Sequence, residues 1–185
     1  MWEPNNASSW GAPAKLFHWL VAVLIFIQFV LGWWAVSWRL SPLKLNLFVW
    51  HKSIGMVILA LVIWRLLWRW MNPTPVLPAD TPAWERVAAR ASHALLYVLM
   101  IALPLSGWLL NSAAGVPFRI FRIIPLSSLI APDKHMAELA ALVHLLLCLA
   151  LAVLLVLHIG AALRHHFIKR NDVLRRMWPA RRSSK

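Results

Sequence analysis

Residues 138–166 read ELAALVHLLLCLALAVLLVLHIGAALRHH, an apolar run that is long enough to cross a lipid bilayer as a helix. Two histidines, His144 and His158, stand inside this run, fourteen residues apart. An α-helix turns about 100° per residue, so this spacing returns the chain to within about 40° of the same face after a rise of about 21 Å. Ionisable groups inside a span are costly and usually functional. The stretch therefore predicts a membrane helix that presents two imidazoles to its neighbours at two depths.

The composition extends this interpretation to the whole chain. Of the 185 residues, 61% are hydrophobic, against a share of about 45–50% in soluble domains. Four segments reach the length of about 20 mostly apolar residues that a span needs: 16–38, 47–70, 91–111 and 137–163. Because backbone polar groups in lipid must bond to one another, each segment is expected to be helical. The sequence predicts an all-α transmembrane four-helix bundle over residues 16–170, between an N-terminal segment 1–15 and a basic tail 171–185.

The distribution of lysine and arginine predicts the orientation, since cytoplasmic loops carry the excess of these residues. With both termini in the cytoplasm, thirteen basic residues lie on that side: Lys15, Arg65, Arg69, Arg86, Arg90, Arg164, Lys169, Arg170, Arg175, Arg176, Arg181, Arg182 and Lys185. Six lie on the opposite side: Arg39, Lys44, Lys52, Arg119, Arg122 and Lys134. The net charge of +13 is therefore assigned to anionic lipid headgroups, with no nucleic-acid partner expected.

The remaining histidines supply partners at matching depths. A haem iron in an electron carrier takes two axial ligands, and neutral imidazole is a common choice. His18 begins the first span on the inner side, level with His158, and His51 begins the second span on the outer side, level with His144. The sequence predicts two bis-histidine haem sites, one pair near each membrane surface, inside a four-helix cage.

Three further residues are candidates for contact with these cofactors. Gly32 lies fourteen residues after His18, and Gly55 lies one turn after His51, so each could leave room for a porphyrin edge. Arg65 lies fourteen residues after His51 and would face the inner cofactor, where it could pair with a propionate. Close helix packing is the alternative for both glycines, and extension to the headgroups is the alternative for Arg65.

His93 is a spare histidine at the inner end of the third span. We expect it beside the inner haem or at a quinone site. Two alternatives stay open, since it could replace His18 or His158 as a ligand, or pack at the membrane interface.

Four stretches resemble the bacterial cytochrome b561 family of small di-haem b-type cytochromes. They are FHWL at 17–20, HKSIG at 51–55, RVAARASHALLYVLMIALPLSG at 86–107 and LHIGAALRHHFIKRNDVLRRM at 157–177. The likeness covers about residues 16–177. It implies His18, His51, His144 and His158 as axial ligands of two non-covalent haem b groups. It also implies a multi-pass protein of the bacterial inner membrane, with ubiquinone as a candidate partner.

The predicted function is electron transfer across the membrane between the quinone pool and a periplasmic donor or acceptor. Six cations against Asp133 and Glu138 on the outer side would attract a small anion or dock an acidic redox protein. One alternative is therefore a superoxide oxidase that passes electrons from periplasmic superoxide to ubiquinone, which leaves open whether the chain is an enzyme. A haem-b anchor subunit of a larger dehydrogenase is a second alternative, and a haem-free transporter or proton channel is a third.

Overall fold

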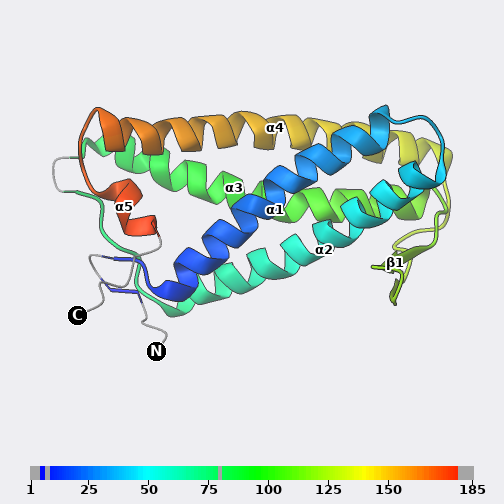
Figure 1. Ribbon diagram of the computed structural model, residues 1–185, viewed down its shortest axis with the longest axis horizontal. Coiled ribbons are helices and arrows are strands. Elements are labelled where there is room, and N and C mark those ends of the chain that lie inside the picture. The colour runs from blue at the N-terminus through cyan, green and yellow to red at the C-terminus, as the bar shows by residue number, and fades with distance from the viewer. Residues whose placement is uncertain (1–4, 7–8, 79–80, 179–185) are drawn as a thin grey trace.

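The computed structural model describes residues 5–6, 9–78 and 81–178. Four long helices run up and down in sequence order (Figure 1). They are α1 (Ala12–Ser37), α2 (Pro42–Met71), α3 (Ala83–Ala113) and α4 (Lys134–Phe167). A short helix α5 (Val173–Met177) follows, and a small hairpin of β1 (Phe118–Ile120) and β2 (Ile124–Leu126) connects α3 to α4.

All four long helices are long and apolar enough to cross a membrane, which confirms the predicted four-helix transmembrane bundle. The helices extend beyond the predicted spans, because polar ends continue the helical hydrogen bonding outside the apolar core. Side-chain caps contribute to two starts: the Ser41 hydroxyl accepts from the Lys44 backbone N–H, and the Asp133 carboxylate accepts from the Met136 backbone N–H.

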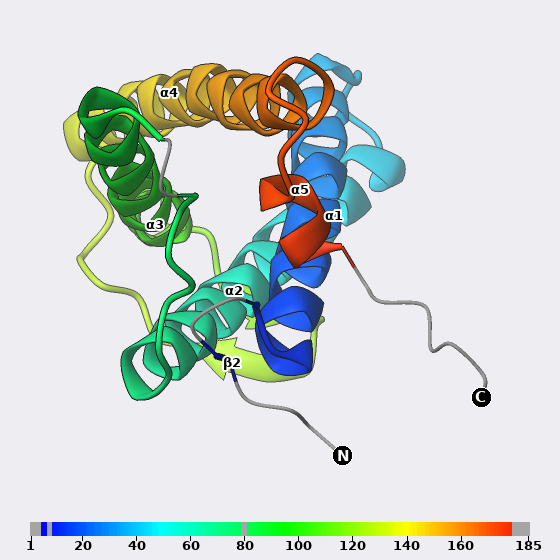
Figure 2. The same ribbon diagram turned by 90° about the vertical axis from the view of Figure 1, so that its left-hand side faces the viewer.

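The bundle is built from two helix pairs. α1 packs on α2, α3 packs on α4, and α2 and α3 join the pairs, whereas α4 stays further from α1 and α2. Seen from one end, the four helices form a ring in sequence order (Figure 2). A small apolar core lies in the middle of the bundle, formed by Val21, Ile25, Ile58, Val62, Leu96, Met100 and Leu151.

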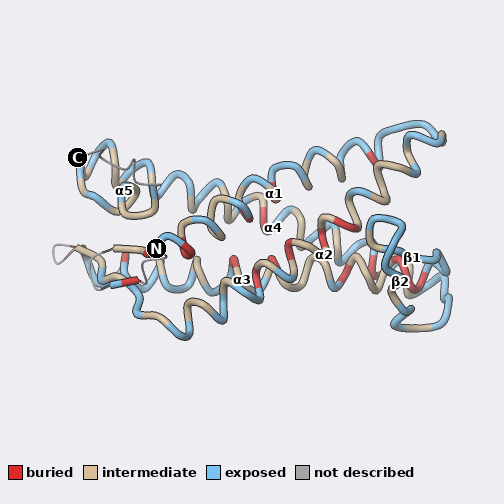
Figure 3. Tube along the Cα trace, turned by 60° about the horizontal axis from the view of Figure 1, so that its bottom comes forward, coloured by how far each residue is buried: buried red, intermediate tan, exposed pale blue. Residues whose placement is uncertain are grey.

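Most of the chain along the four long helices is exposed or only partly buried (Figure 3), and many of its exposed residues are large and apolar. Large side chains such as Trp33 and Val156 are each 71% exposed. A soluble protein rarely leaves long contiguous apolar faces open, whereas a bilayer covers them. The burial pattern therefore fits a bundle whose outside is in contact with lipid.

The β-hairpin was not predicted, because its strands are only three residues long. It lies against the first turns of α2: the Phe121 backbone N–H donates to the buried Ser53 hydroxyl at 2.8 Å, and the Phe121 and Trp50 rings meet edge to face at 5.5 Å. Phe121 and Arg122 adopt φ angles of 49° and 63° at the turn. Such left-handed conformations are uncommon for bulky residues, so contacts to α2 must hold the turn in place.

Ion pairs connect the helices at the opposite end of the bundle. The buried Glu85 carboxylate accepts from Arg164 at 3.0 Å and from Lys169 at 2.5 Å, which ties the start of α3 to the end of α4. The Trp19 indole N–H donates to the Met177 carbonyl at 2.9 Å and so connects α1 to α5. The end of the predicted basic tail, residues 179–185, lies outside the described residues.

Candidate functional site

The four predicted ligand histidines meet as two pairs in the interior of the bundle. His18 on α1 faces His158 on α4, with ring centroids 6.3 Å apart. His51 on α2 faces His144 on α4, with ring centroids 6.4 Å apart. α4 therefore contributes one imidazole to each pair, at the two depths that the fourteen-residue spacing requires.

The ring-centroid separations within the two pairs can be compared with those of a metal-bridged pair and of a hydrogen-bonded pair of imidazoles. Metal–imidazole bonds of about 2 Å on each side, plus about 1.1 Å from each ring nitrogen to its ring centre, separate two centroids by about 6.2 Å. A direct hydrogen bond between two ring nitrogens at about 2.9 Å would bring the centroids to about 5.1 Å. The observed 6.3 and 6.4 Å exceed the separation of directly hydrogen-bonded rings and leave room for a metal ion between the two imidazoles.

The described residues hold no cluster of three or more histidine, cysteine, aspartate or glutamate side chains suited to a bare metal ion. Two imidazoles supply only two ligands to each site. The pairs therefore suit a metal whose remaining ligands come from a bound macrocycle, and haem provides such a ligand set.

His93 on α3 lies beside the inner pair. Its ring centroid is 5.6 Å from that of His158, at an interplanar angle of 63°. The separation from His18 to His158 is 6.3 Å, so three imidazoles gather at the inner site. His93 is therefore a neighbour of His158, and its possible role as a ligand stays open.

Glycines bring backbone close to the rings of the outer pair. A Cβ atom on Gly32 would lie 3.1 Å from His51 Cε1, and one on Gly107 would lie 3.3 Å from His144 Cε1. Both contacts are tighter than ordinary side-chain packing, so each glycine makes space that a ring occupies. Gly32 was a predicted contact residue, whereas Gly107 was not identified from the sequence.

Gly55, the other predicted glycine, adjoins a polar side chain. A Cβ atom there would lie 3.1 Å from the Nε2 atom of Gln28, which donates to the His51 carbonyl at 2.9 Å. Because Gly55 has no side chain, the Gln28 amide has room to donate to the His51 carbonyl. A glutamine within an apolar span was a signal for a functional contact that sequence reasoning did not use.

Ser106 was also missed, and it contacts a candidate ligand. Its hydroxyl oxygen lies 2.9 Å from His144 Nδ1 and 2.8 Å from the Leu103 carbonyl oxygen. By contrast, the buried His51 Nδ1 atom makes no hydrogen bond of normal geometry within the part of the chain that the structure describes. The two rings of the outer pair therefore have different polar surroundings.

Arg65 points into the bundle at the inner pair. Its Nη2 atom lies 3.0 Å from His18 Nδ1, and its guanidinium carbon lies 5.5 Å from the Tyr97 ring centroid. Arg69 approaches the same ring at 5.8 Å. No carboxylate among the described residues forms an ion pair with Arg65. A half-buried cation without an anionic partner is suited to form an ion pair with a propionate of a haem bound by His18 and His158.

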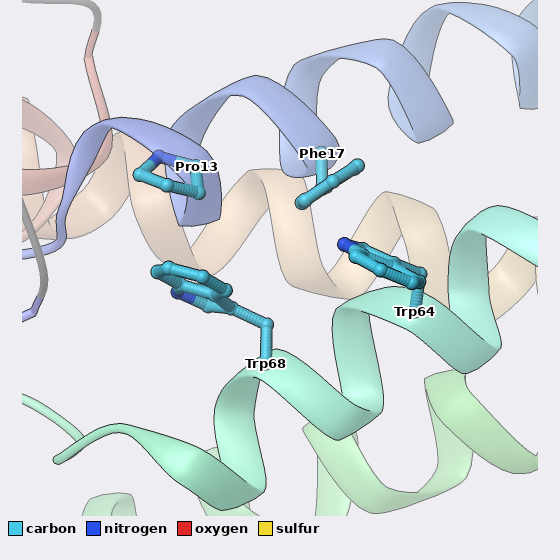
Figure 4. Close-up of a pocket in the computed structure, with 4 residues that line it drawn as sticks. All are labelled: Pro13, Phe17, Trp64 and Trp68. Carbon is cyan, nitrogen blue, oxygen red and sulfur yellow. The ribbon is translucent and has the colours of Figure 1, made fainter. Parts of the chain in front are cut away.

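An apolar cleft of about 340 Å³ opens between α1 and α2 (Figure 4). Pro13, Phe17, Trp64 and Trp68 line it. Phe17 precedes His18 in the chain, and Trp64 precedes Arg65. The cleft and the inner histidine pair therefore involve neighbouring residues of the same two helices, on faces about 100° apart.

The arrangement defines a class of protein: a four-helix membrane protein whose interior carries two facing histidine pairs suited to haem. The family model described as prokaryotic cytochrome b561 matches residues 9–180. The chain belongs to the prokaryotic cytochrome b561 family, as its sequence resemblance predicted.

Relatives of known name support this assignment. "Cytochrome b561 homolog 2" of Escherichia coli (strain K12) is 36% identical over 180 residues, which cover 94% of this chain and 93% of the relative. "Cytochrome b561 homolog 1" of the same strain is 28% identical over 169 residues, or 89% of this chain and 94% of the relative. "Probable superoxide oxidase CybB" of Yersinia pestis is 30% identical over 169 residues, or 89% of this chain and 93% of the relative.

Family and fold together establish the location and the type of cofactor. The chain is a multi-pass protein of the bacterial inner membrane, and membership of this family implies haem b. The paired rings, the glycines beside them and the unpaired cation near His18 fit that cofactor.

Proposed function

We propose that this protein carries single electrons across the inner membrane through two haem b groups, between the quinone pool and a redox partner in the periplasm. The observation that carries the proposal is the presence of two facing histidine pairs, with centroid separations of 6.3 and 6.4 Å, joined by one helix. Haem b supplies reversible one-electron chemistry when it is bound.

The spacing of the pairs supports transfer across the membrane. Fourteen residues of α4 correspond to about 21 Å along the helix axis, which is most of a hydrocarbon core of about 30 Å. One pair thus lies below each membrane surface. A single pair at one depth would reach only one side of the bilayer.

The side chains around the pairs have separate tasks in this proposal. His18 and His158 bind one iron, and His51 and His144 bind the other. Arg65 neutralises a propionate of the inner haem, which an apolar bundle would otherwise leave uncompensated. The surrounding apolar helices keep water away and so favour electron exchange over side reactions.

The cleft between α1 and α2 is the proposed binding site for the quinone. Its lining of Phe17, Trp64 and Trp68 provides flat apolar surface for a quinone ring. Phe17 and Trp64 are chain neighbours of His18 and Arg65, so a ring bound there would lie at the depth of the inner haem. The aromatic lining also explains why the cleft could bind a molecule that arrives through the lipid.

Haem stoichiometry and a potentiometric titration of the purified protein test the proposal. We expect two haems per chain and two reduction steps of near equal amplitude. His144→Ala should remove one haem and one step, because the His51 ligand loses its partner. His135→Ala is the matched control, since His135 is exposed at the start of α4 and should leave both steps intact. Fewer than two haems in the unmutated protein, or two full steps in His144→Ala, would contradict the assignment.

A second candidate function is oxidation of superoxide. The similarity to the Yersinia pestis relative and the basic residues of the hairpin end, among them Arg119 and Arg122, favour it. Cations around an opening raise the arrival rate of an anion, and salt screens that effect. Stopped-flow mixing with superoxide distinguishes the two functions. An oxidase is reduced rapidly by superoxide, with a rate that falls as salt rises, whereas a carrier shows no such reaction and forms a complex with its periplasmic partner.

A further inference from the structure

The hydroxyl of Ser106 has one hydrogen, and its surroundings decide where that hydrogen points. The Leu103 carbonyl oxygen, 2.8 Å away, can only accept. The hydroxyl can donate to Leu103, a back-bond that serine commonly forms within helices. In that arrangement the hydroxyl oxygen, 2.9 Å from His144 Nδ1, accepts from a proton on Nδ1.

A neutral imidazole protonated at Nδ1 has its free lone pair at Nε2. That nitrogen is the one available to a metal ion. Hydrogen bonds to the remote ring nitrogen are the usual means by which proteins orient a metal-binding histidine and raise its basicity.

We propose that Ser106 is a positioning residue that selects the Nδ1–H tautomer of His144 and presents its Nε2 atom to the haem iron. The inference rests on the proposed function for the identity of the metal centre. Its structural part, the tautomer of His144, stands on the geometry of Ser106 alone.

The packing around Ser106 holds this arrangement in place. Ser106 is 9% exposed and lies on α3, which packs along α4 where His144 is located. The neighbouring residue Gly107 brings its backbone against His144 Cε1, where a Cβ atom would lie at 3.3 Å. Ser106 thus determines which ring nitrogen is protonated, and Gly107 limits where the ring can lie.

Within the described residues, two of the other candidate ligands, His18 and His51, have no hydroxyl acceptor at Nδ1. His18 Nδ1 lies 3.0 Å from Arg65 Nη2, an atom that cannot accept. His51 Nδ1 makes no hydrogen bond of normal geometry within the described residues. Ser106 therefore makes the two haem sites unequal. A more basic ligand stabilises ferric iron, so the bond to Ser106 lowers the reduction potential of the site that contains His144.

Three variants of the full-length protein test the inference. Ser106→Ala removes the acceptor, and Ser106→Thr retains a hydroxyl. Ser112→Ala is the matched control, because Ser112 is a buried serine of the same helix that donates to the Trp108 carbonyl at 2.9 Å. Alanine favours the helix, and threonine has a helix propensity close to that of serine, so none of these changes should prevent folding.

In Ser106→Ala, one reduction step should move to higher potential and the affinity of one haem should fall about tenfold, the lower end of the effect expected when such a partner is removed. The other step should stay in place. Ser106→Thr should restore the original potential, and Ser112→Ala should match the unmutated protein. A Ser106→Ala titration identical to the original, or an equal shift of both steps, would overturn the inference.

Nitrogen-15 spectra of histidine-labelled protein give a readout that does not depend on activity. His144, assigned by comparison with the His144→Ala variant, should show a protonated Nδ1. Protonation at Nε2 without a bound metal would refute the role of Ser106 whatever the haem content. If the protein contained no haem but His144 had the Nδ1–H form, the proposed function would fail and the structural inference would survive.

Discussion

Gly32 and Gly160 are both helical glycines, yet they have opposite surroundings. A Cβ atom on Gly32 would lie 3.1 Å from the His51 ring, whereas one on Gly160 would have no neighbour within 4 Å. We therefore expect Gly32→Val to displace His51 and to cost about 1–3 kcal/mol of stability through overpacking. The haem held by His51 and His144 should be lost first, measured as a fall in haem content.

Gly160→Val is the control for this prediction, because its new methyl groups would extend into open space. It should keep both haems and the original thermal stability. Equal haem content in the two valine variants would mean that Gly32 serves only to pack α1.

Arg65 and Arg69 provide a second comparison at the level of single residues. Both approach the Tyr97 ring, but only Arg65 reaches a candidate ligand, His18. Arg65→Met should lower the potential of one reduction step and weaken retention of the inner haem, because a cation near the iron stabilises the reduced state.

Arg69→Met should have a smaller effect on the same step. Potentiometric titration of both variants measures the difference. If the two variants behave alike, the contribution of Arg65 is that of general positive charge and involves no specific propionate contact.

At the scale of elements, the β-hairpin depends on α2 for its conformation. Ser53 is fully buried and accepts from the Phe121 backbone N–H at the strained turn. Ser53→Ala should leave that N–H without its partner and destabilise the hairpin locally by about 1 kcal/mol. Amide hydrogen exchange over residues 118–126 should become about fivefold faster, since 1.4 kcal/mol corresponds to about tenfold.

Ser128→Ala is the control, since Ser128 is exposed beyond the hairpin. It should leave the exchange rates unchanged. Unaltered exchange in Ser53→Ala would indicate that the ring contact between Trp50 and Phe121 is sufficient to hold the turn.

At the scale of the whole molecule, four spans require both termini to lie on the same side, and the distribution of charge predicts that this side is the cytoplasm. Single cysteine substitutions can test the orientation in a Cys148→Ser background. Lys134→Cys, at an exposed position where α4 starts, should react with a membrane-impermeant maleimide added from the periplasm.

Arg170→Cys, beyond the end of α4, should react only after the membrane is permeabilised. The reverse pattern would invert the orientation. It would place the hairpin end, and with it the His51 and His144 pair, on the cytoplasmic side.

The number of membrane helices and the pairing of the four histidines by depth follow from the amino-acid sequence alone. Both depend on properties that are local along the chain. An apolar run of sufficient length can only be a helix in lipid, and the fixed rise per residue converts a spacing such as that of His144 and His158 into a depth. The family resemblance came from the same local stretches.

The side-chain contacts between helices, in contrast, depend on how the helices pack. The bond from His144 to Ser106, the contact of Gly107 with the same ring, and the approach of Arg65 to His18 each join two helices. Such contacts depend on how far each helix is rotated and shifted against its neighbour, and packing of the whole bundle sets those values. The hairpin on α2 has the same origin, because three-residue strands gain their stability from the helix beneath them.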